Sequence, residues 1–163
     1  MAEQLTTLKF YSDRFSFAAG HFTVFSATKR ERMHGHTYRV KAKLTVPIRE
    51  LGMAEDYALF DDHLAALCKR LNTFYLLPRD CPHLPITEVG EYYETEFNGK
   101  KLTFLKEDCI VLPVINITIE ELSRWFVQEI MSDQELVNAY DVRELKISVY
   151  NGFAHGASAE YIR

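Results

Sequence analysis

Three histidines in the first quarter of the chain have the spacing of ligands for one metal ion. His34 and His36 lie one residue apart at the start of a segment in which apolar and polar residues alternate, so both imidazoles fall on the apolar face of a predicted strand. His21 ends an earlier segment and follows Ala18–Gly20, whose small side chains leave room for an ion. If the two segments pair as an antiparallel hairpin, the imidazoles converge with one coordination position open, as in a catalytic zinc site. Neutral imidazoles suit zinc better than magnesium or calcium, although the spacing alone also fits three unrelated histidines.

Two strands and a helix are the elements predicted to position these histidines. We predict a first strand over residues 5–21 and a second strand over residues 34–47, which Pro47 ends. A helix follows, because apolar residues recur there at helical spacing. The residues of this predicted buried stripe are Phe60, Leu64, Leu67, Cys68 and Leu71.

The second half of the chain predicts a hairpin, a second helix and two closing strands. The dipeptide Asn98-Gly99 favours a tight hairpin turn. Thr118 and Glu121 form a capping box at the start of the second helix. The predicted strands of this half cover residues 92–97, 101–105, 110–114, 145–150 and 157–162. This order of elements indicates an α+β fold in which helices pack on one face of an antiparallel sheet.

The composition limits the class of protein. The chain has 163 residues, which we interpret as a single domain over residues 1–163 with a sizeable core. Its net charge is −4 with acidic and basic residues mixed, which argues against general nucleic-acid binding. No apolar run approaches the roughly 20 residues of a membrane span, and Met1–Gln4 shows no secretory signal. Cys68, Cys81 and Cys109 are odd in number and widely spaced, which predicts free thiols in a cytoplasmic protein.

Residues 17–21 read Phe-Ala-Ala-Gly-His, and residues 34–38 read His-Gly-His-Thr-Tyr. Together these motifs resemble the 6-pyruvoyl-tetrahydropterin synthase and 6-carboxy-tetrahydropterin synthase superfamily, which has a Phe-small-small-small-His strand followed by His-Gly-His-Asn-Tyr. The resemblance spans nearly the whole chain, because further stretches agree in order. These stretches are Gly52–Tyr57, Leu71–Pro78, Pro113–Glu120 and a final strand that ends near Asn151.

The resemblance implies a fold, a metal and an activity. It implies the tunnelling fold, in which subunits of ββααββ type form trimeric barrels that usually pair into hexamers. It also implies that His21, His34 and His36 bind Zn2+. The implied activity is that of a lyase on dihydroneopterin triphosphate or a related pterin, by triphosphate elimination or side-chain cleavage, in folate or queuosine biosynthesis. Thr118 and Glu120 match the family's Thr-x-Glu segment beside the pterin pocket, although the electrostatics of a helix start also account for Glu120.

The residues that would transfer protons depart from the family pattern. The resembled enzymes use a cysteine together with an aspartate–histidine pair, but no cysteine lies between His21 and His34. Glu31 instead matches a subgroup with the motif Glu-x-x-His-Gly-His, which resembles enzymes that release 6-hydroxymethyl-dihydropterin by carbon–carbon cleavage. A carboxylate near zinc can act as a base, so Glu31 is the candidate catalytic residue. The alternative is that Glu31 is one solvated charge in a basic run.

The position of the aspartate–histidine pair is also altered. It aligns with Asn72 and Thr73, neither of which can act as a general base at neutral pH. His155, or Asp62 with His63, are candidate replacements, although a loop histidine and the polar face of a helix account for them more simply. The sequence therefore leaves the proton carrier open.

These altered residues leave three hypotheses for the function. The leading one is a zinc-dependent lyase with a small pterin-like substrate, a homo-oligomer without a nucleic-acid or membrane partner. The second is a diverged zinc-binding paralogue with another substrate. It is favoured by Asn72, Thr73 and Asn151, since the family anchors the pterin ring with a glutamate at this last position. The third is a non-catalytic binding module, which the open ligand position disfavours because structural zinc usually takes four protein ligands.

Overall fold

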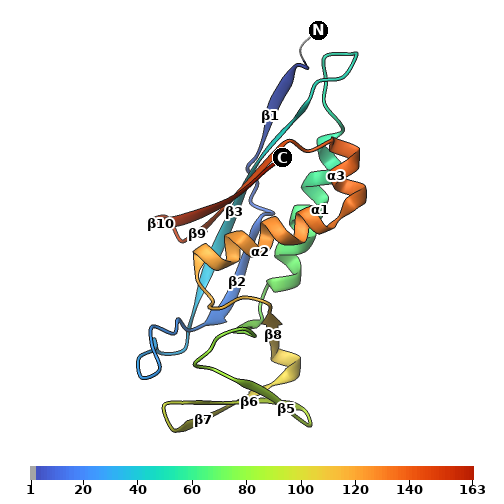
Figure 1. Ribbon diagram of the computed structural model, residues 1–163. Coiled ribbons are helices and arrows are strands. Elements are labelled where there is room, and N and C mark those ends of the chain that lie inside the picture. Colours follow the sequence, from blue (N-terminus) through green and yellow to red (C-terminus); the bar gives the residue numbers. More distant parts are fainter. Residues whose placement is uncertain (1–2) are drawn as a thin grey trace.

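The computed structural model describes residues 3–163, which form two sheets and three α-helices (Figure 1). Met1 and Ala2, which belong to the amino-terminal stretch without a signal pattern, lie outside the described residues. The strands are β1 (Leu5–Phe10), β2 (Ser16–His21), β3 (His34–Pro47), β4 (Tyr75–Pro78), β5 (Ile86–Val89), β6 (Tyr92–Phe97), β7 (Lys100–Leu105), β8 (Cys109–Leu112), β9 (Glu144–Asn151) and β10 (His155–Ile162). The helices are α1 (Tyr57–Leu71), α2 (Ile119–Ser132) and α3 (Gln134–Tyr140), with a short 3-10 helix at Lys106–Asp108.

The larger sheet has seven strands in the order β10-β9-β3-β2-β4-β8, with β1 also beside β3. Its long central strand is β3, which pairs antiparallel with β9 on one side and with β1 and β2 on the other. The predicted antiparallel arrangement holds for these strands and for β10, whereas the short strands β4 and β8 join in parallel. The α+β prediction is thus confirmed, with a curled, mixed sheet.

The predicted first strand is in fact two strands. The chain leaves the sheet between β1 and β2, and both of these strands pair with β3. In the interruption, the Phe15 amide donates to the Ser12 carbonyl at 3.1 Å, and the Phe15 carbonyl accepts from the Val40 amide at 2.8 Å. The prediction of one continuous strand over residues 5–21 is wrong, because the serine and aspartate in this stretch favour a turn.

The helices cover one face of the larger sheet, as the sequence predicts (Figure 1). All five apolar residues of the predicted α1 stripe are buried. Helix α2 begins at the predicted cap, where the Thr118 hydroxyl accepts from the Glu121 amide at 3.3 Å, and it buries Trp125 in the core. The sequence pattern does not predict α3, which is short and begins where Asp133 accepts from the Leu136 amide at 3.0 Å.

Strands β5, β6 and β7 form a smaller antiparallel sheet near the end of the molecule where β3 begins (Figure 1). The β6–β7 turn is the one that the sequence predicts, because Asn98 and Gly99 have φ values of 50° and 72° and lie between the paired residues Phe97 and Lys100. Strand β5 is an addition that the sequence pattern does not predict. A second hydrophobic cluster holds this sheet against the segment after β2. Its buried members are Phe22, Val24, Cys81, Leu84 and Phe97.

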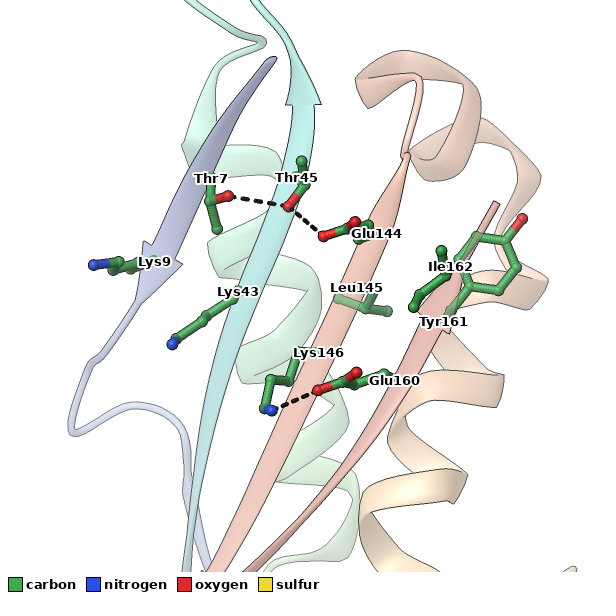
Figure 2. A pocket seen from close by; sticks show the side chains of 10 residues that line it. All are labelled: Thr7, Lys9, Lys43, Thr45, Glu144, Leu145, Lys146, Glu160, Tyr161 and Ile162. Carbon is green, nitrogen blue, oxygen red and sulfur yellow. Dashed lines mark hydrogen bonds and ion pairs between the residues drawn. The ribbon is translucent and has the colours of Figure 1, made fainter.

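The face of the larger sheet opposite the helices is polar. Figure 2 shows Thr7, Thr45 and Glu144 joined across β1, β3 and β9, with 3.0 Å between the two hydroxyls and 3.2 Å from Thr45 to Glu144. On the same face, Lys146 pairs with Glu160 of β10. These exposed contacts link four neighbouring strands, and each contributes little to stability because water screens it.

No helix within residues 3–163 is long and apolar enough to span a membrane.

The three cysteines are free thiols, as the sequence predicts. Cys68, Cys81 and Cys109 are all buried. Burial raises the pKa of the Cys68 thiol to about 12 and that of Cys109 to about 11. Both are therefore protonated at neutral pH and are poor nucleophiles and proton carriers.

Candidate metal centre

His21, His34 and His36 meet at one end of the larger sheet. Strands β2 and β3 pair so that His21 faces His34 and Ala19 faces His36. The three imidazoles lie on the helix-covered face, and their centroids are 4.6 Å apart for His21 and His34, 4.6 Å for His34 and His36, and 5.1 Å for His21 and His36. One nitrogen from each ring lies within 4.8 Å of the others. The convergence that strand parity predicts is therefore present.

Backbone carbonyls fix the orientation of two of the rings. His21 Nδ1 lies 2.9 Å from the Ile117 carbonyl oxygen and donates to it, so the lone pair resides on Nε2. His34 Nδ1 donates to the Arg32 carbonyl at 2.7 Å, and His34 Nε2 lies 2.9 Å from His36 Nε2. His21 Nε2 is buried and has no hydrogen-bond partner among residues 3–163. This donor set fits a metal ion, because ligating histidines usually donate their second ring N–H to a carbonyl.

The charge state of the rings also suits a metal. The pKa of His21 is lowered to about 4, first by burial and then by His34 and His36, although the hydrogen bond to Ile117 acts to raise it. The pKa of His36 is also lowered, first by burial and then by His34. Both imidazoles are therefore neutral at physiological pH, which is the form that binds a metal.

Close packing of the strands requires the glycines next to the histidines. The contacts of these glycines are with the protein itself and not with space for an ion. A Cβ atom on Gly20 would lie 2.5 Å from Cδ2 of Tyr75, whose ring packs directly on the strand. A Cβ atom on Gly35 would lie 3.2 Å from the Ala19 carbonyl oxygen. The small residues at these positions thus let β2, β3 and the Tyr75 ring approach closely enough to align the imidazoles.

Glu31 lies beside the three histidines. Its Oε2 atom is 3.9 Å from His34 Nε2 and accepts a hydrogen bond from the Thr23 amide at 2.9 Å. Burial acts to raise the pKa of Glu31, but the hydrogen bonds from Thr23 and the positive charge of His34 outweigh it and hold the pKa below its usual value. The side chain is about one-third exposed, so an ionised carboxylate faces both the imidazoles and solvent.

The segment that begins α2 closes the other side of this centre. Ile117, whose carbonyl holds His21, directly precedes Thr118. The Thr118 hydroxyl is used as the helix cap, and Glu120 is exposed in the first turn of α2. The structure therefore places Thr118 next to the centre, while Glu120 projects from the helix start.

Asn72 and Thr73 follow α1 and clamp strand β2. The Asn72 side chain accepts from the Ala18 amide at 2.8 Å, and the Thr73 amide donates to the Ala18 carbonyl at 2.7 Å. Thr73 has a φ of 71°, a left-handed conformation that is unfavourable for a β-branched residue. Thr73 and His36 also line the same open hollow of about 360 Å³.

The other candidate proton carriers are engaged elsewhere. Asp62 pairs with Arg14 at 2.6 Å, and His63 lies 3.4 Å from Asp133 rather than beside the three histidines. His155 is exposed at the start of β10 and is the cross-strand partner of Asn151. None of these residues forms a hydrogen bond or an ion pair with the histidine cluster among residues 3–163.

Sequence reasoning missed the groups that hold the centre together. Two of them, the carbonyls of Arg32 and Ile117, are backbone atoms and have no signature in the sequence. Asn116 is a third, because its side chain accepts from the Val24 amide at 3.1 Å and donates to the Val24 carbonyl at 2.8 Å. The sequence indicates the role of Asn116 only by placing an amide side chain shortly before the helix cap. The same stretch, Asn116-Ile117-Thr118, matches a glycosylation sequon.

The family model described as 6-pyruvoyl tetrahydropterin synthase matches residues 11–162. Among curated relatives, a proposed 6-carboxy-5,6,7,8-tetrahydropterin synthase of Pyrococcus abyssi is 28% identical over 135 residues, which cover 82% of this chain and 78% of the relative. A protein of Methanocaldococcus jannaschii with the same proposed activity is 24% identical over 142 residues, or 86% of each chain.

Solved structures show the same fold. The crystal structure of 6-pyruvoyl tetrahydropterin synthase from Plasmodium vivax has a TM-score of 0.91 at 24% identity and covers 99% of this chain and 100% of its own. A second structure of the Plasmodium vivax protein, with a TM-score of 0.90, is of a variant in which a glutamate described as a catalytic residue is replaced by alanine. The expected tunnelling fold is confirmed by these matches.

Proposed function

Since the chain belongs to the 6-pyruvoyl tetrahydropterin synthase family, we propose that it is a zinc-dependent lyase that acts on dihydroneopterin triphosphate or a related pterin. The observation that carries the proposal is the cluster of three converging imidazoles with an ionised carboxylate beside it. An oriented metal-binding set next to a candidate base is the minimum that an elimination or a carbon–carbon cleavage needs.

In this proposal the three histidines hold zinc through the ring nitrogens that face one another. His21 and His34 are already held in the required orientation by the carbonyls of Ile117 and Arg32. When bound, zinc supplies a Lewis acid that polarises a hydroxyl or carbonyl of the substrate. Three protein ligands leave a coordination position for that group, which is why a catalytic role is favoured over a structural one.

Glu31 is the proposed acid/base. Its Oε2 atom is held by the Thr23 amide, and Oε1 has no hydrogen-bond partner among the described residues, so Oε1 is free to take and return a proton. The depressed pKa keeps the carboxylate ready to accept that proton. The variant of the Plasmodium vivax protein supports this role by analogy, because a glutamate is described there as a catalytic residue.

Substrate contacts are proposed for Thr118 and Glu120. Thr118 directly follows Ile117, whose carbonyl holds His21. Glu120 offers an exposed carboxylate at the start of α2. A carboxylate can accept charge-assisted hydrogen bonds from the N–H groups of a pterin ring.

We also propose a homo-oligomer built from trimers, as a hexamer, in the cytoplasm. Strands β1 and β10 support this assembly, since within residues 3–163 each pairs with a single neighbour and so leaves a free edge. Leu5 and Ile162 on these strands are 44% and 68% exposed. A free edge with exposed apolar side chains is unfavourable in an isolated subunit. The three free thiols agree with a reducing compartment.

A diverged substrate is the second candidate function. It is favoured by Asn72, which is used to hold β2, and by Asn151, which offers an uncharged amide where a pterin-anchoring carboxylate is expected. Under this alternative the metal and Glu31 remain, but the heterocycle differs.

The deciding experiment is to incubate the zinc-loaded protein with dihydroneopterin triphosphate and to identify the products by mass. We expect 6-hydroxymethyl-dihydropterin, and we expect Glu31→Gln to lower the rate by about 10²–10⁴-fold while zinc stays bound. Glu129→Gln is the matched control, because Glu129 forms an ordinary surface ion pair with Arg70 at 2.7 Å. A 6-pyruvoyl or 6-carboxy product would assign proton transfer to another residue. No product from a protein with zinc bound would contradict the pterin proposal and support the second candidate.

A further inference from the structure

A basic hollow of about 320 Å³ is lined in part by Glu31. It lies between the tips of two hairpins, one over residues 24–30 and the other at the β6–β7 turn. Both tips lie at the same end of the molecule (Figure 1). We call it the basic pocket, and the residues that line it are Thr28, Lys29, Arg30, Glu31, Arg32, Phe97, Asn98, Lys100 and Leu102.

Both hairpin tips are ordered by backbone hydrogen bonds. In the first, Val24 bridges to Arg30, and the Phe25 and Ser26 amides donate to the Lys29 carbonyl at 2.9 and 3.1 Å. In the second, the tight Asn98-Gly99 turn sets the position of the flanking strand residues. The walls of the basic pocket are therefore preorganised rather than loose loops.

Arg30 joins the two walls. Its guanidinium carbon lies 4.8 Å from the centroid of the Phe22 ring and 5.7 Å from that of Phe97, which belongs to the second hairpin. Its Nη1 atom donates to the Glu31 carbonyl at 2.7 Å. Arg30 thus fixes the smaller sheet against the chain that carries Glu31, and the cation is part of the wall.

The charges of the basic pocket are not balanced. Lys29, Arg32 and Lys100 are exposed and form no ion pair among residues 3–163, and Glu31 is the single carboxylate in the lining. Lysines nearby on the same sheet behave differently. Lys101 pairs with Glu94 at 2.7 Å, and Lys106 pairs with Glu88 at 2.7 Å.

Four cations against one carboxylate are unusual in a chain whose net charge is −4. Such a concentration of unpaired cations in a preformed hollow is suited to an anion with several negative oxygens. Lysine and arginine are the side chains that bind phosphate groups most strongly.

We infer that the basic pocket binds the phosphate chain of the substrate, with Lys29, Arg32 and Lys100 as its ligands. The inference rests on the proposed function for the identity of the substrate. Because Glu31 lies 3.9 Å from His34 and also lines the basic pocket, a molecule whose reacting end is at the histidines can extend its phosphate chain directly into this hollow. The smaller sheet then has a role, which is to supply Lys100 and so select phosphorylated over unphosphorylated substrates.

Lys100 and its neighbour Lys101 provide a matched pair of variants. Successive side chains of a strand point to opposite faces, so Lys100 lines the basic pocket while Lys101 pairs with Glu94. We expect Lys100→Gln to weaken the binding of inorganic triphosphate to the zinc-loaded protein about tenfold in calorimetry, and Lys101→Gln to leave it unchanged. Equal affinity of the two variants would overturn the inference.

Two further measurements separate this inference from the proposed function. Inorganic triphosphate also binds zinc, so the metal content is measured after each titration, and the comparison is made between variants with the same metal centre. In kinetics, Lys100→Gln should raise KM about tenfold for dihydroneopterin triphosphate and should not change it for unphosphorylated dihydroneopterin. Triphosphate binding that depends on Lys100 in a protein without pterin lyase activity would refute the proposed function and keep the basic pocket as an anion site. An equal change in KM for both substrates would refute the phosphate assignment.

Discussion

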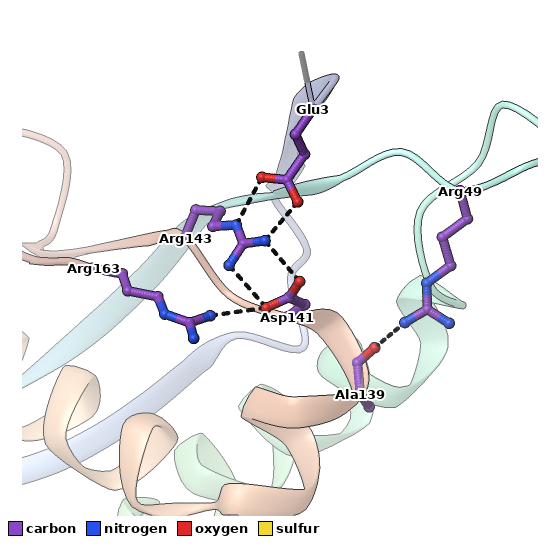
Figure 3. Close-up of polar contacts among 6 residues, drawn as sticks. All are labelled: Glu3, Arg49, Ala139, Asp141, Arg143 and Arg163. Carbon is purple, nitrogen blue, oxygen red and sulfur yellow. Dashed lines mark hydrogen bonds and ion pairs between the residues drawn. The ribbon is translucent and has the colours of Figure 1, made fainter. Parts of the chain in front are cut away.

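The two ends of strand β3 satisfy their polar groups in opposite ways. At the end near Thr45, the backbone amide of Arg143 donates to the Thr45 carbonyl. The guanidinium group of Arg143 forms ion pairs with Glu3 at 2.6 Å and with Asp141 at 2.8 Å. Arg163 also pairs with Asp141, at 2.9 Å. Figure 3 shows that these contacts form one network which ties the chain near both termini to the end of α3.

The opposite end of β3 keeps polar groups without partners. His21 Nε2 is buried and unpaired, and the cations Lys29, Arg32 and Lys100 have no carboxylate partner among residues 3–163. Unsatisfied buried groups and clustered like charges cost free energy, so folding alone favours their removal. The comparison teaches that one end of the sheet is built for stability, whereas the other end keeps the unpaired groups that the proposed metal and anion sites would use.

The largest effect that tests this comparison is expected from His34→Ala. Removal of this imidazole should leave two ligands, so zinc content should fall from about one ion per chain to nearly none, and activity should fall at least about a thousandfold. Metal analysis and product formation measure the two quantities. Arg143→Ala is the control at the other end of β3, and it should lower Tm slightly while zinc and activity remain. Full activity of His34→Ala without metal would refute the division between the two ends.

At the end of the sheet that carries the histidines, the sequence predicts the features that depend on residues close together in the chain. Alternation along residues 34–47 fixes which face His34 and His36 occupy, and the parity of His21 adds the third ring to the same face. The Asn98-Gly99 turn and the Thr118 cap are equally local, since each depends on a few neighbouring residues. These predictions are confirmed.

The parts that the sequence does not predict depend on contacts between distant segments. The Ile117 carbonyl meets His21 across 96 residues, and backbone atoms carry no residue-specific signal. The basic pocket arises because the smaller sheet docks Phe97 beside Arg30, a contact that neither hairpin encodes alone. His63 illustrates the converse, since it lies beside Asp62 in the sequence but pairs with Asp133 in space.

A smaller effect, confined to the stable end, is expected from Tyr140→Phe. The Tyr140 hydroxyl is buried, accepts from the Phe60 amide at 3.0 Å and donates to the Asp56 carbonyl, so it bridges the first turn of α1. Its loss should leave the Phe60 amide without a partner and the Asp56 carbonyl with only the Leu59 amide at 3.4 Å, and should lower the free energy of unfolding by about 1–3 kcal/mol. Denaturant unfolding measures this change, and Tyr57→Phe is the control because Tyr57 is 69% exposed. Loss of zinc from Tyr140→Phe would show that the two ends are coupled.

The smallest effect, at the end that carries the histidine cluster, is expected from Thr73→Gly. The left-handed φ of 71° strains a β-branched residue by about 1–2 kcal/mol, and glycine removes that strain. Glycine also gains entropy in the unfolded chain, so the net increase in the free energy of unfolding should be about 0.5–1 kcal/mol. Asn98→Gly is the control, since asparagine adopts its φ of 50° with little strain and should gain less. If Thr73→Gly is more stable but loses activity with zinc retained, the strain belongs to the site and not to the fold. If Thr73→Gly is less stable than the wild type, the packing of Thr73 stabilises the fold by more than its strained backbone costs. The contrast in stability between the two ends of β3 would then be smaller than the unpaired polar groups indicate.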